Sequence, residues 1–268
     1  MAAGCVLITG ASRGLGAALA RHVAAPGMVL RLVARDAASL EAVAAECRAR
    51  GAAVETAPLD VRDAAAMAER LLAWDGAQPF THLVAAAGIS SGTPPEGGLE
   101  GPELAARTVA VNLGGAMNTV APLLPRLIAR RAGRVVLVGS VAGFLGLPDS
   151  PAYCASKAGL WAWGEALRAK LAPEGVGVTV AAPGFFRSAM SARYAGPHPG
   201  EISAEAMARR IWRAAERGRG RVAVPAALGW LLRLLPLLPA PLADRAARLH
   251  RFTITPEAAP HPPPPCAP

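Results

Sequence analysis

Short apolar runs alternate with longer alanine-rich segments along most of the chain. Seven runs have the length and the Val, Ile and Leu content of buried β-strands, at 5–9, 28–34, 53–57, 82–86, 134–138, 176–181 and 221–225. Helices are expected between them at 14–25, 39–50, 63–74, 101–131 and 151–171. Continuous apolar strands separated by helices indicate a parallel sheet covered on both faces. The pattern therefore predicts one doubly wound α/β domain with about seven strands.

The last part of the chain departs from this alternation. Leu228, Leu231, Leu232 and Leu235 have the spacing of one helical stripe, and Arg233 falls on the opposite side. We expect a domain over 1–225, an apolar and basic helical extension over 226–255, and a disordered tail over 256–268, where proline dominates.

Composition narrows the class of protein. Apolar residues make up 53% of the 268 positions, as in a folded domain. Four scattered cysteines, Cys5, Cys47, Cys154 and Cys266, lack metal spacing and indicate reduced thiols in a cytoplasmic protein. The five histidines are dispersed, so no metal site is expected. The N-terminus lacks the features of a signal peptide, and Arg233 with three prolines interrupts the longest apolar stretch, 226–243, so no membrane-spanning helix is expected.

Positive charge is concentrated near the C-terminus. The net charge is +9, and residues 201–251 hold ten arginines against four acidic residues, a local +6. A nucleic-acid surface is one interpretation of such a cluster. Because neither an aromatic stacking pattern nor a DNA-binding motif accompanies it, we expect no nucleic-acid partner.

The first predicted strand runs into the sequence T-G-A-S-R-G-L-G, residues 9–16. Glycines at 10, 14 and 16 between a strand and a helix allow a sharp turn and the close approach of a pyrophosphate to the helix N-terminus. The spacing differs from the usual G-x-G-x-x-G fingerprint, so a plain tight turn is the alternative interpretation of these glycines taken alone.

A second motif pairs rare residues. The chain has two tyrosines and two lysines, and Tyr153 stands four positions before Lys157 in a predicted helix, on the same face. A nearby ammonium lowers the pKa of a phenol, so the pair suits proton exchange with an alcohol or ketone oxygen. An exposed helix contact is the alternative. Ser140 follows the fifth strand, where doubly wound folds bind ligands, although a serine there is more often a turn or a cap.

Together these motifs resemble the short-chain dehydrogenase/reductase family, over roughly residues 4–190. Further landmarks of that family are L-D-V (59–61), V-N-L-G-G (111–115), G-S-V-A-G (139–143) and P-G-F-F-R-S (183–188). One departure is A-A-A-G (85–88), where relatives usually have N-N-A-G, so the side-chain amides that brace the sheet in relatives are lost.

The resemblance implies a Rossmann-type fold and assigns roles to residues of this chain. Tyr153 would be the general acid/base, Lys157 would support it and bind a ribose, Ser140 would bind the substrate oxygen, and Asn112 would position a water. The cofactor would lie on Gly10, Ser12, Arg13, Gly14, Leu15, Gly16, Arg35, Asp60, Val61, Ala87, Gly88, Asn112, Tyr153, Lys157, Pro183, Gly184, Phe186 and Ser188.

The residue type at the end of the second predicted strand indicates whether NAD(H) or NADP(H) is preferred. NAD-specific sites usually place an acidic residue there, whereas this chain has Ala34 followed by Arg35, with Arg13 in the glycine turn. Two guanidinium groups match the oxygens of a 2′-phosphate, which favours NADP(H), with NAD(H) as the other option. Alternatively, Arg35 pairs with Asp36 and both are surface residues.

The substrate follows less directly from the sequence. Apolar residues follow the predicted strands at 134–138 and 176–181, and they suggest a hydrophobic ketone, aldehyde or secondary alcohol as the substrate of an oxidoreductase. These residues are Phe144, Leu145, Leu147, Phe185, Phe186, Met190 and Tyr194. Residues 188–203 are expected to form a lid. The family usually assembles as dimers or tetramers, here through 101–131 and 151–171.

Three questions stay open at the level of the sequence. A catalytically silent scaffold or redox sensor is the alternative to an enzyme, although such proteins typically lose the tyrosine or lysine. An epimerase or dehydratase would use the same sites. The extension over 226–251 either makes a peripheral contact with an anionic membrane, or closes the substrate cleft or packs on another subunit.

Overall fold

The computed structural model describes residues 4–249 and 251–255, so the expected tail over 256–268 lies outside the described residues. Seven parallel strands form one sheet in the order β3-β2-β1-β4-β5-β6-β8. These strands are β1 (Gly4–Thr9), β2 (Met28–Ala34), β3 (Ala53–Pro58), β4 (His82–Ala85), β5 (Arg134–Val138), β6 (Gly177–Pro183) and β8 (Arg221–Val224). The prediction of a doubly wound α/β fold with about seven parallel strands is confirmed.

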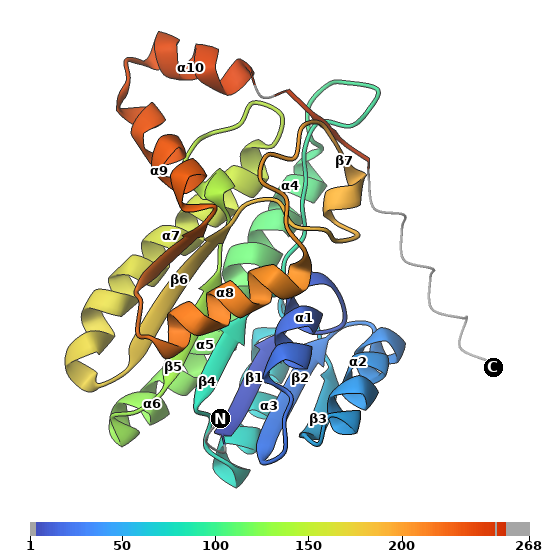
Figure 1. Ribbon diagram of the computed structural model, residues 1–268, viewed down its shortest axis with the longest axis vertical. Helices are drawn as coiled ribbons and strands as arrows, with labels where there is room; N and C mark the ends of the chain where they lie inside the picture. The colour runs from blue at the N-terminus through green and yellow to red at the C-terminus, as the bar shows by residue number, and fades with distance from the viewer. Residues whose placement is uncertain (1–3, 250, 256–268) are drawn as a thin grey trace.

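Ten α-helices cover or extend this sheet in the described part of the chain (Figure 1). They are α1 (Gly14–Val23), α2 (Ala37–Ala49), α3 (Ala64–Ala77), α4 (Pro102–Val109), α5 (Gly115–Val120), α6 (Leu124–Arg130), α7 (Pro151–Leu171), α8 (Ala204–Glu216), α9 (Ala226–Leu234) and α10 (Ala240–Arg248). The expected single helix over 101–131 is interrupted, because a π-helical turn forms at Ala110–Gly114 and Pro122 falls in a 3-10 turn.

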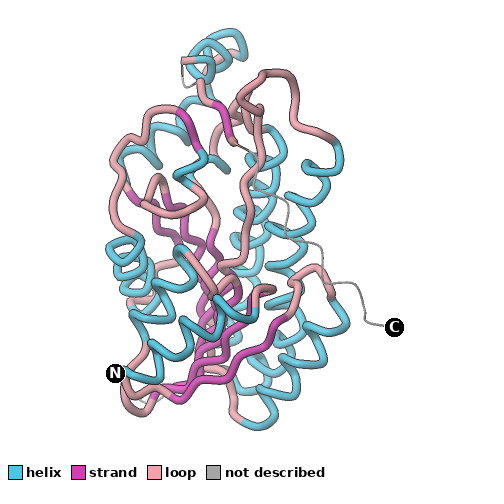
Figure 2. The backbone as a smooth tube through the Cα atoms, turned by 90° about the vertical axis from the view of Figure 1, so that its right-hand side faces the viewer, coloured by secondary structure: helices cyan, strands magenta, loops and turns pink. Residues whose placement is uncertain are grey.

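Side chains of the central strands alternate between two cores, as the pleat of a strand requires. On β1, Val6 and Ile8 enter a core with α1, α2 and α8, whereas Cys5 and Leu7 enter a second core with α3, α5 and α7. Figure 2 shows the strands between the resulting helix layers. Helix α8 was not predicted, although Met207, Ile211 and its other apolar residues recur at helical spacing and Ser203 caps its N-terminus.

A small antiparallel sheet joins two distant segments at one end of the molecule. Strand β7 (Tyr194–Ala195) pairs with β9 (Thr253–Ile254). The ladder ties the loop after β6 to the last described residues. Strands this short carry no periodic signal, so the sequence did not predict them.

Helix α7 lies unusually close to the sheet. A Cβ atom added at Gly164 would lie 2.5 Å from Val180 Cγ2 and 2.8 Å from Leu137 Cδ1, both of them fully buried side chains. Gly143 makes a second close approach, because a Cβ there would lie 2.8 Å from the backbone of Lys157. These contacts set the distance between α7 and the sheet, and they therefore set the positions of Tyr153 and Lys157.

We predict that Gly164→Val lowers the free energy of unfolding by about 1–3 kcal/mol, because the added methyl groups overpack the core between α7, β5 and β6. Gly114→Ala is the matched control, since a Cβ at Gly114 meets no atom within 4 Å. Urea unfolding of both variants measures the difference, and equal midpoints would show that α7 tolerates displacement from the sheet.

Candidate active site

A cleft of about 950 Å³ opens at the carboxyl ends of the parallel strands. It lies where the strand order reverses between β1 and β4, which is the usual ligand site of doubly wound sheets. All but one of the residues expected to bind the cofactor line it, as does the expected catalytic Ser140. The cofactor residues are Gly10, Ser12, Arg13, Gly14, Leu15, Gly16, Arg35, Asp60, Val61, Ala87, Gly88, Tyr153, Lys157, Pro183, Gly184, Phe186 and Ser188.

The glycine turn between β1 and α1 fits a dinucleotide. Gly10 and Gly14 have φ values of 69° and 56°, which side chains rarely adopt. A Cβ at Gly16 would lie 2.2 Å from the carbonyl oxygen of Gly10, so only glycine lets the helix start this close to the strand. No side chain caps α1, and its N-terminal N–H groups can therefore bind a pyrophosphate.

The cleft wall beyond β2 holds Arg35, Asp36 and Ser39, with Arg13 opposite in the turn. Asp36 caps α2 by accepting a hydrogen bond from the Ser39 backbone N–H at 2.9 Å. This bond is the main reason that the pKa of Asp36 lies below its ordinary value, and the charge of Arg13 adds to it. The Asp36 carboxylate thus caps α2, and the structure gives no support to an ion pair between Arg35 and Asp36.

Ser140 and Tyr153 meet in the middle of the cleft. Ser140 begins a 3-10 turn at Val141–Gly143, where its Oγ accepts a hydrogen bond from the Ala142 N–H at 3.1 Å. The same Ser140 hydroxyl lies near the Tyr153 phenol and acts to lower its pKa. Two hydroxyl groups from β5 and α7 therefore converge at a point where an oxygen of a ligand could accept a proton.

The electrostatics of Tyr153 differ from the expectation. We expected Lys157 to lower the pKa of the phenol, but burial raises it, and the Ser140 hydroxyl only partly offsets the effect. The physical reason is the position of Lys157, whose Nζ lies 5.7 Å from the centroid of the Tyr153 ring and donates to the Val138 carbonyl oxygen at 3.0 Å. Burial lowers the pKa of Lys157 to about 8.

Asn112 is the one expected cofactor residue that does not line the cleft. It is fully buried in the π-helical turn, where its Oδ1 accepts from the Ile89 N–H at 2.8 Å. Its Nδ2 donates to the Ile89 carbonyl at 3.0 Å and to Ser156 Oγ at 2.9 Å. The side chain thus joins the segment after β4 to α7, and it braces the region in which Ala85 and Ala86 replace the amides of relatives.

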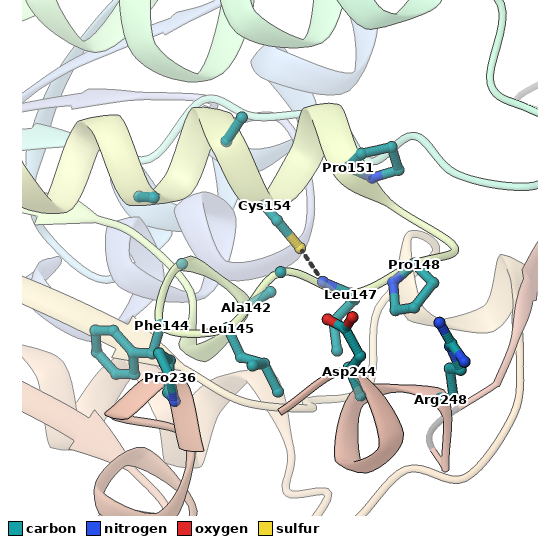
Figure 3. Close-up of a pocket in the computed structure, with 15 residues that line it drawn as sticks. Ala142, Phe144, Leu145, Leu147, Pro148, Pro151, Cys154, Pro236, Asp244 and Arg248 are labelled. Carbon is teal, nitrogen blue, oxygen red and sulfur yellow. Dashed lines mark hydrogen bonds between the residues drawn. The ribbon is translucent and has the colours of Figure 1, made fainter. Parts of the chain in front are cut away.

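The expected apolar substrate residues divide among three places. Phe186 and Met190 line the cleft. Phe144, Leu145 and Leu147 instead line a separate cavity of about 690 Å³ beneath α7, together with Cys154, Pro236, Asp244 and Arg248 (Figure 3). Phe185 and Tyr194 form an aromatic cluster with His198 and Phe252. The expectation that these residues line one apolar pocket was therefore wrong. Spacing along the chain does not tell which side of a loop faces the cleft.

Three polar residues of the cleft were not predicted. They are Asp36, which precedes α2, Ser39 of α2 and Arg107 of α4. None stands in a family landmark, and each has the pattern of an ordinary surface residue in the sequence. Within the described residues, no group of three or more His, Cys, Asp or Glu side chains is placed to hold a metal ion.

Comparison with known proteins identifies the family. A family model described as short chain dehydrogenase matches residues 4–197. The chain therefore belongs to the short-chain dehydrogenase family, and it is an NAD(P)-dependent dehydrogenase or reductase. An uncharacterized oxidoreductase of Myxococcus xanthus is 36% identical over 242 residues, covering 90% of this chain and 95% of the relative.

Solved structures agree with the fold. A short-chain dehydrogenase from Sphingobium yanoikuyae in complex with NADPH is 28% identical, with a TM-score of 0.74, and the match covers 83% of this chain and 88% of that one. A short-chain dehydrogenase from Mycobacterium paratuberculosis bound to NAD has a TM-score of 0.72 at 21% identity, covering 83% and 96% of the two chains. Structures similar to this chain thus hold either cofactor.

We predict a pH-dependent stability that comes from Lys157. Between about pH 8 and the ordinary lysine value of 10.5, the unfolded chain binds a proton that the folded chain has released. Lys157 therefore contributes about 1–3 kcal/mol to the free energy of unfolding, and this contribution grows as pH rises through the window. The buried thiols oppose it, because burial raises the pKa of Cys154 to about 11. Lys157→Met should remove the Lys157 contribution, so in urea unfolding of the cofactor-free protein the stability should fall with pH relative to that of the unmodified protein.

Lys170→Met is the control, because Lys170 is the other lysine of the chain and lies exposed on the same helix. It should keep the pH dependence of the unmodified protein. The same pH dependence in both variants would mean that Lys157 is not the titrating group.

Proposed function

We propose that the protein is an NADP(H)-dependent oxidoreductase that interconverts a ketone or aldehyde and an alcohol on an apolar small molecule, with Tyr153 as the general acid/base. The observation that carries the proposal is the convergence of the Ser140 and Tyr153 hydroxyls, with buried Lys157 behind them, in a cleft whose other end is a glycine turn. When bound, the nicotinamide would supply or accept the hydride.

The chain's own residues would supply the proton and the binding of the reacting oxygen. Because burial raises the pKa of Tyr153, the phenol is protonated at neutral pH and suits donation to a carbonyl oxygen. Ser140 would donate a hydrogen bond to the same oxygen and stabilise the charge that develops there. Lys157, whose pKa is about 8, can exchange a proton near working pH. This arrangement favours the reductive direction.

The preference for NADP(H) rests on the charges at the cofactor end of the cleft. Arg13 and Arg35 line it together, and Ser39 adds a hydroxyl. The main acidic competitor, Asp36, is engaged by the N-terminus of α2. A 2′-phosphate would pair with the two guanidinium groups, whereas the ribose of NAD(H) carries only a neutral 2′-hydroxyl at this place. The NADPH bound to the Sphingobium yanoikuyae structure supports the choice.

An apolar substrate is consistent with Phe186 and Met190, which line the cleft beside the reacting hydroxyls. The lid over 188–203 and the subunit contacts through 101–131 and 151–171 stay predictions. A silent scaffold is the main alternative, and the experiments below distinguish it, since a scaffold would bind the cofactor without turnover.

Tyr153→Phe should lower turnover by about 10²–10⁴-fold while it leaves the dissociation constant for NADPH nearly unchanged, because the ring stays and only the proton donor is lost. Tyr194→Phe is the matched control at the other tyrosine of the chain. Steady-state oxidation of NADPH over a panel of apolar ketones and aldehydes measures turnover, and fluorescence titration measures binding. Near-normal turnover of Tyr153→Phe would reject the assignment.

Arg35→Ala should weaken NADPH binding by roughly 10–100-fold and leave NADH binding almost unchanged, because a charge-assisted bidentate contact with the 2′-phosphate is lost. Arg48→Ala, at the far end of α2, controls for the loss of charge. Titration of the unmodified protein with both cofactors completes the test. If NADH binds as tightly as NADPH, the preference is wrong.

A further inference from the structure

Exposed apolar side chains are concentrated on one segment, which we call the C-terminal arm (residues 226–249). Nine large apolar residues are exposed in the described part of the chain, and seven belong to the arm, with exposed fractions of 43% to 84%: Trp230, Leu231, Leu234, Leu237, Leu238, Leu242 and Leu249. Figure 1 shows α10 at one end of the molecule, beyond the sheet. A cluster of this size marks an interaction surface.

Helix α9, at the start of the arm, packs closely against the body of the protein, so the outward direction of its exposed side chains is fixed. It approaches β8 through Gly229, where a Cβ would lie 2.4 Å from the Cβ of Ala223. The Arg233 guanidinium lies 4.2 Å from the Phe144 ring centroid and 4.4 Å from that of Trp161. The sequence places Arg233 opposite the leucine stripe, and stacking on two aromatic rings holds it against the body there.

The exposed leucines of the arm line neither the cleft nor the cavity beneath α7. The arm contributes Pro236, Asp244, Ala247 and Arg248 to that cavity, and none of its residues to the cleft. The predicted stripe of Leu228, Leu231, Leu232 and Leu235 is therefore divided: Leu231 is 55% exposed, while the other three are half-buried. The arm does not use its exposed leucines to close the substrate cleft.

The charge around this apolar surface is positive. Arg245 and Arg248 on α10 are exposed, and Asp244 is the single acidic residue of the arm. Arg251, just beyond the arm, is exposed but pairs with Asp149 at 3.0 Å. Leu242, Arg245 and Leu249 share one face of α10, since they are spaced i, i+3 and i+7. Apolar and basic groups on a common face complement an anionic surface that has an apolar interior.

We propose that the C-terminal arm docks on the surface of a bilayer that contains anionic lipids, with its exposed leucines among the acyl chains and its arginines among the headgroups. No helix of the described residues is long and apolar enough to cross a membrane, so the arm lies in the plane of the interface. Trp230, 64% exposed beside Leu231 and Leu234, is a residue type that favours this interface. A second copy fits the surface less well, since its own arginines would face those of the first.

Flotation of the full-length protein with vesicles tests the proposal, and it does not depend on catalysis. The protein should float with vesicles that contain phosphatidylserine, much less with phosphatidylcholine alone, and less as salt rises. Leu237→Glu should lower the partition coefficient at least tenfold, because a carboxylate neither enters the acyl layer nor tolerates anionic headgroups. Leu99→Glu is the matched control, with exposed fractions of 89% for Leu99 and 78% for Leu237.

Arg245→Glu should also reduce flotation, whereas Arg48→Glu, an equal change of charge on α2, should not. Thermal melts confirm that each variant is folded. The proposal is overturned if the unmodified protein does not float, or if Leu237→Glu and Leu99→Glu float equally. It is also overturned if Leu237→Glu lowers the mass measured by light scattering without changing flotation, since the surface is then an interface between copies.

Discussion

The close packing of α7 on the sheet is the constraint on which the rest of the site depends. Gly164 removes the side chain that would hold the helix away from β5 and β6, and Gly143 lets the turn after β5 lie against the backbone of Lys157. At this distance the Lys157 ammonium is buried against the Val138 carbonyl, and the Tyr153 hydroxyl reaches Ser140. A helix placed farther out would leave these groups in water, with ordinary pKa values and no common point of convergence.

Burial favours the neutral form of both titratable groups, so it shifts their pKa values in opposite directions. The pKa of Tyr153 rises, and the phenol retains the proton that a carbonyl oxygen needs, while the pKa of Lys157 falls to about 8, so its ammonium releases a proton more readily. The opposite end of the cleft is charged and exposed, since Arg13 and Arg35 present fixed positive charge to solvent and to any phosphate. One cleft thus combines a desolvated proton site with an anion site, at the two sides of the strand-order reversal.

The sequence predicted what depends on local pattern. Continuous apolar runs located the seven strands of the main sheet, and the glycine turn and the Tyr153–Lys157 pair located the cleft. The features that it did not predict depend on the direction in which a side chain points in the folded protein. A π-helical turn points the Asn112 amide at Ile89 rather than into the cleft. Arg233 lies on the polar side of the predicted stripe, yet two aromatic rings from other elements draw it inward. Phe144 follows β5 and Phe185 follows β6, but both side chains face away from the cleft.

We propose that the cleft catalyses reduction of a carbonyl group rather than only binding a dinucleotide. The most direct measurement follows the transferred atom. NADPH labelled with deuterium at the reactive carbon of the nicotinamide is incubated with the protein and a panel of apolar ketones and aldehydes, and the products are analysed by mass spectrometry and NMR. We expect deuterium on the carbinol carbon of an apolar product, in a single configuration. Tight binding of NADPH without label in any product would contradict it and identify a silent scaffold.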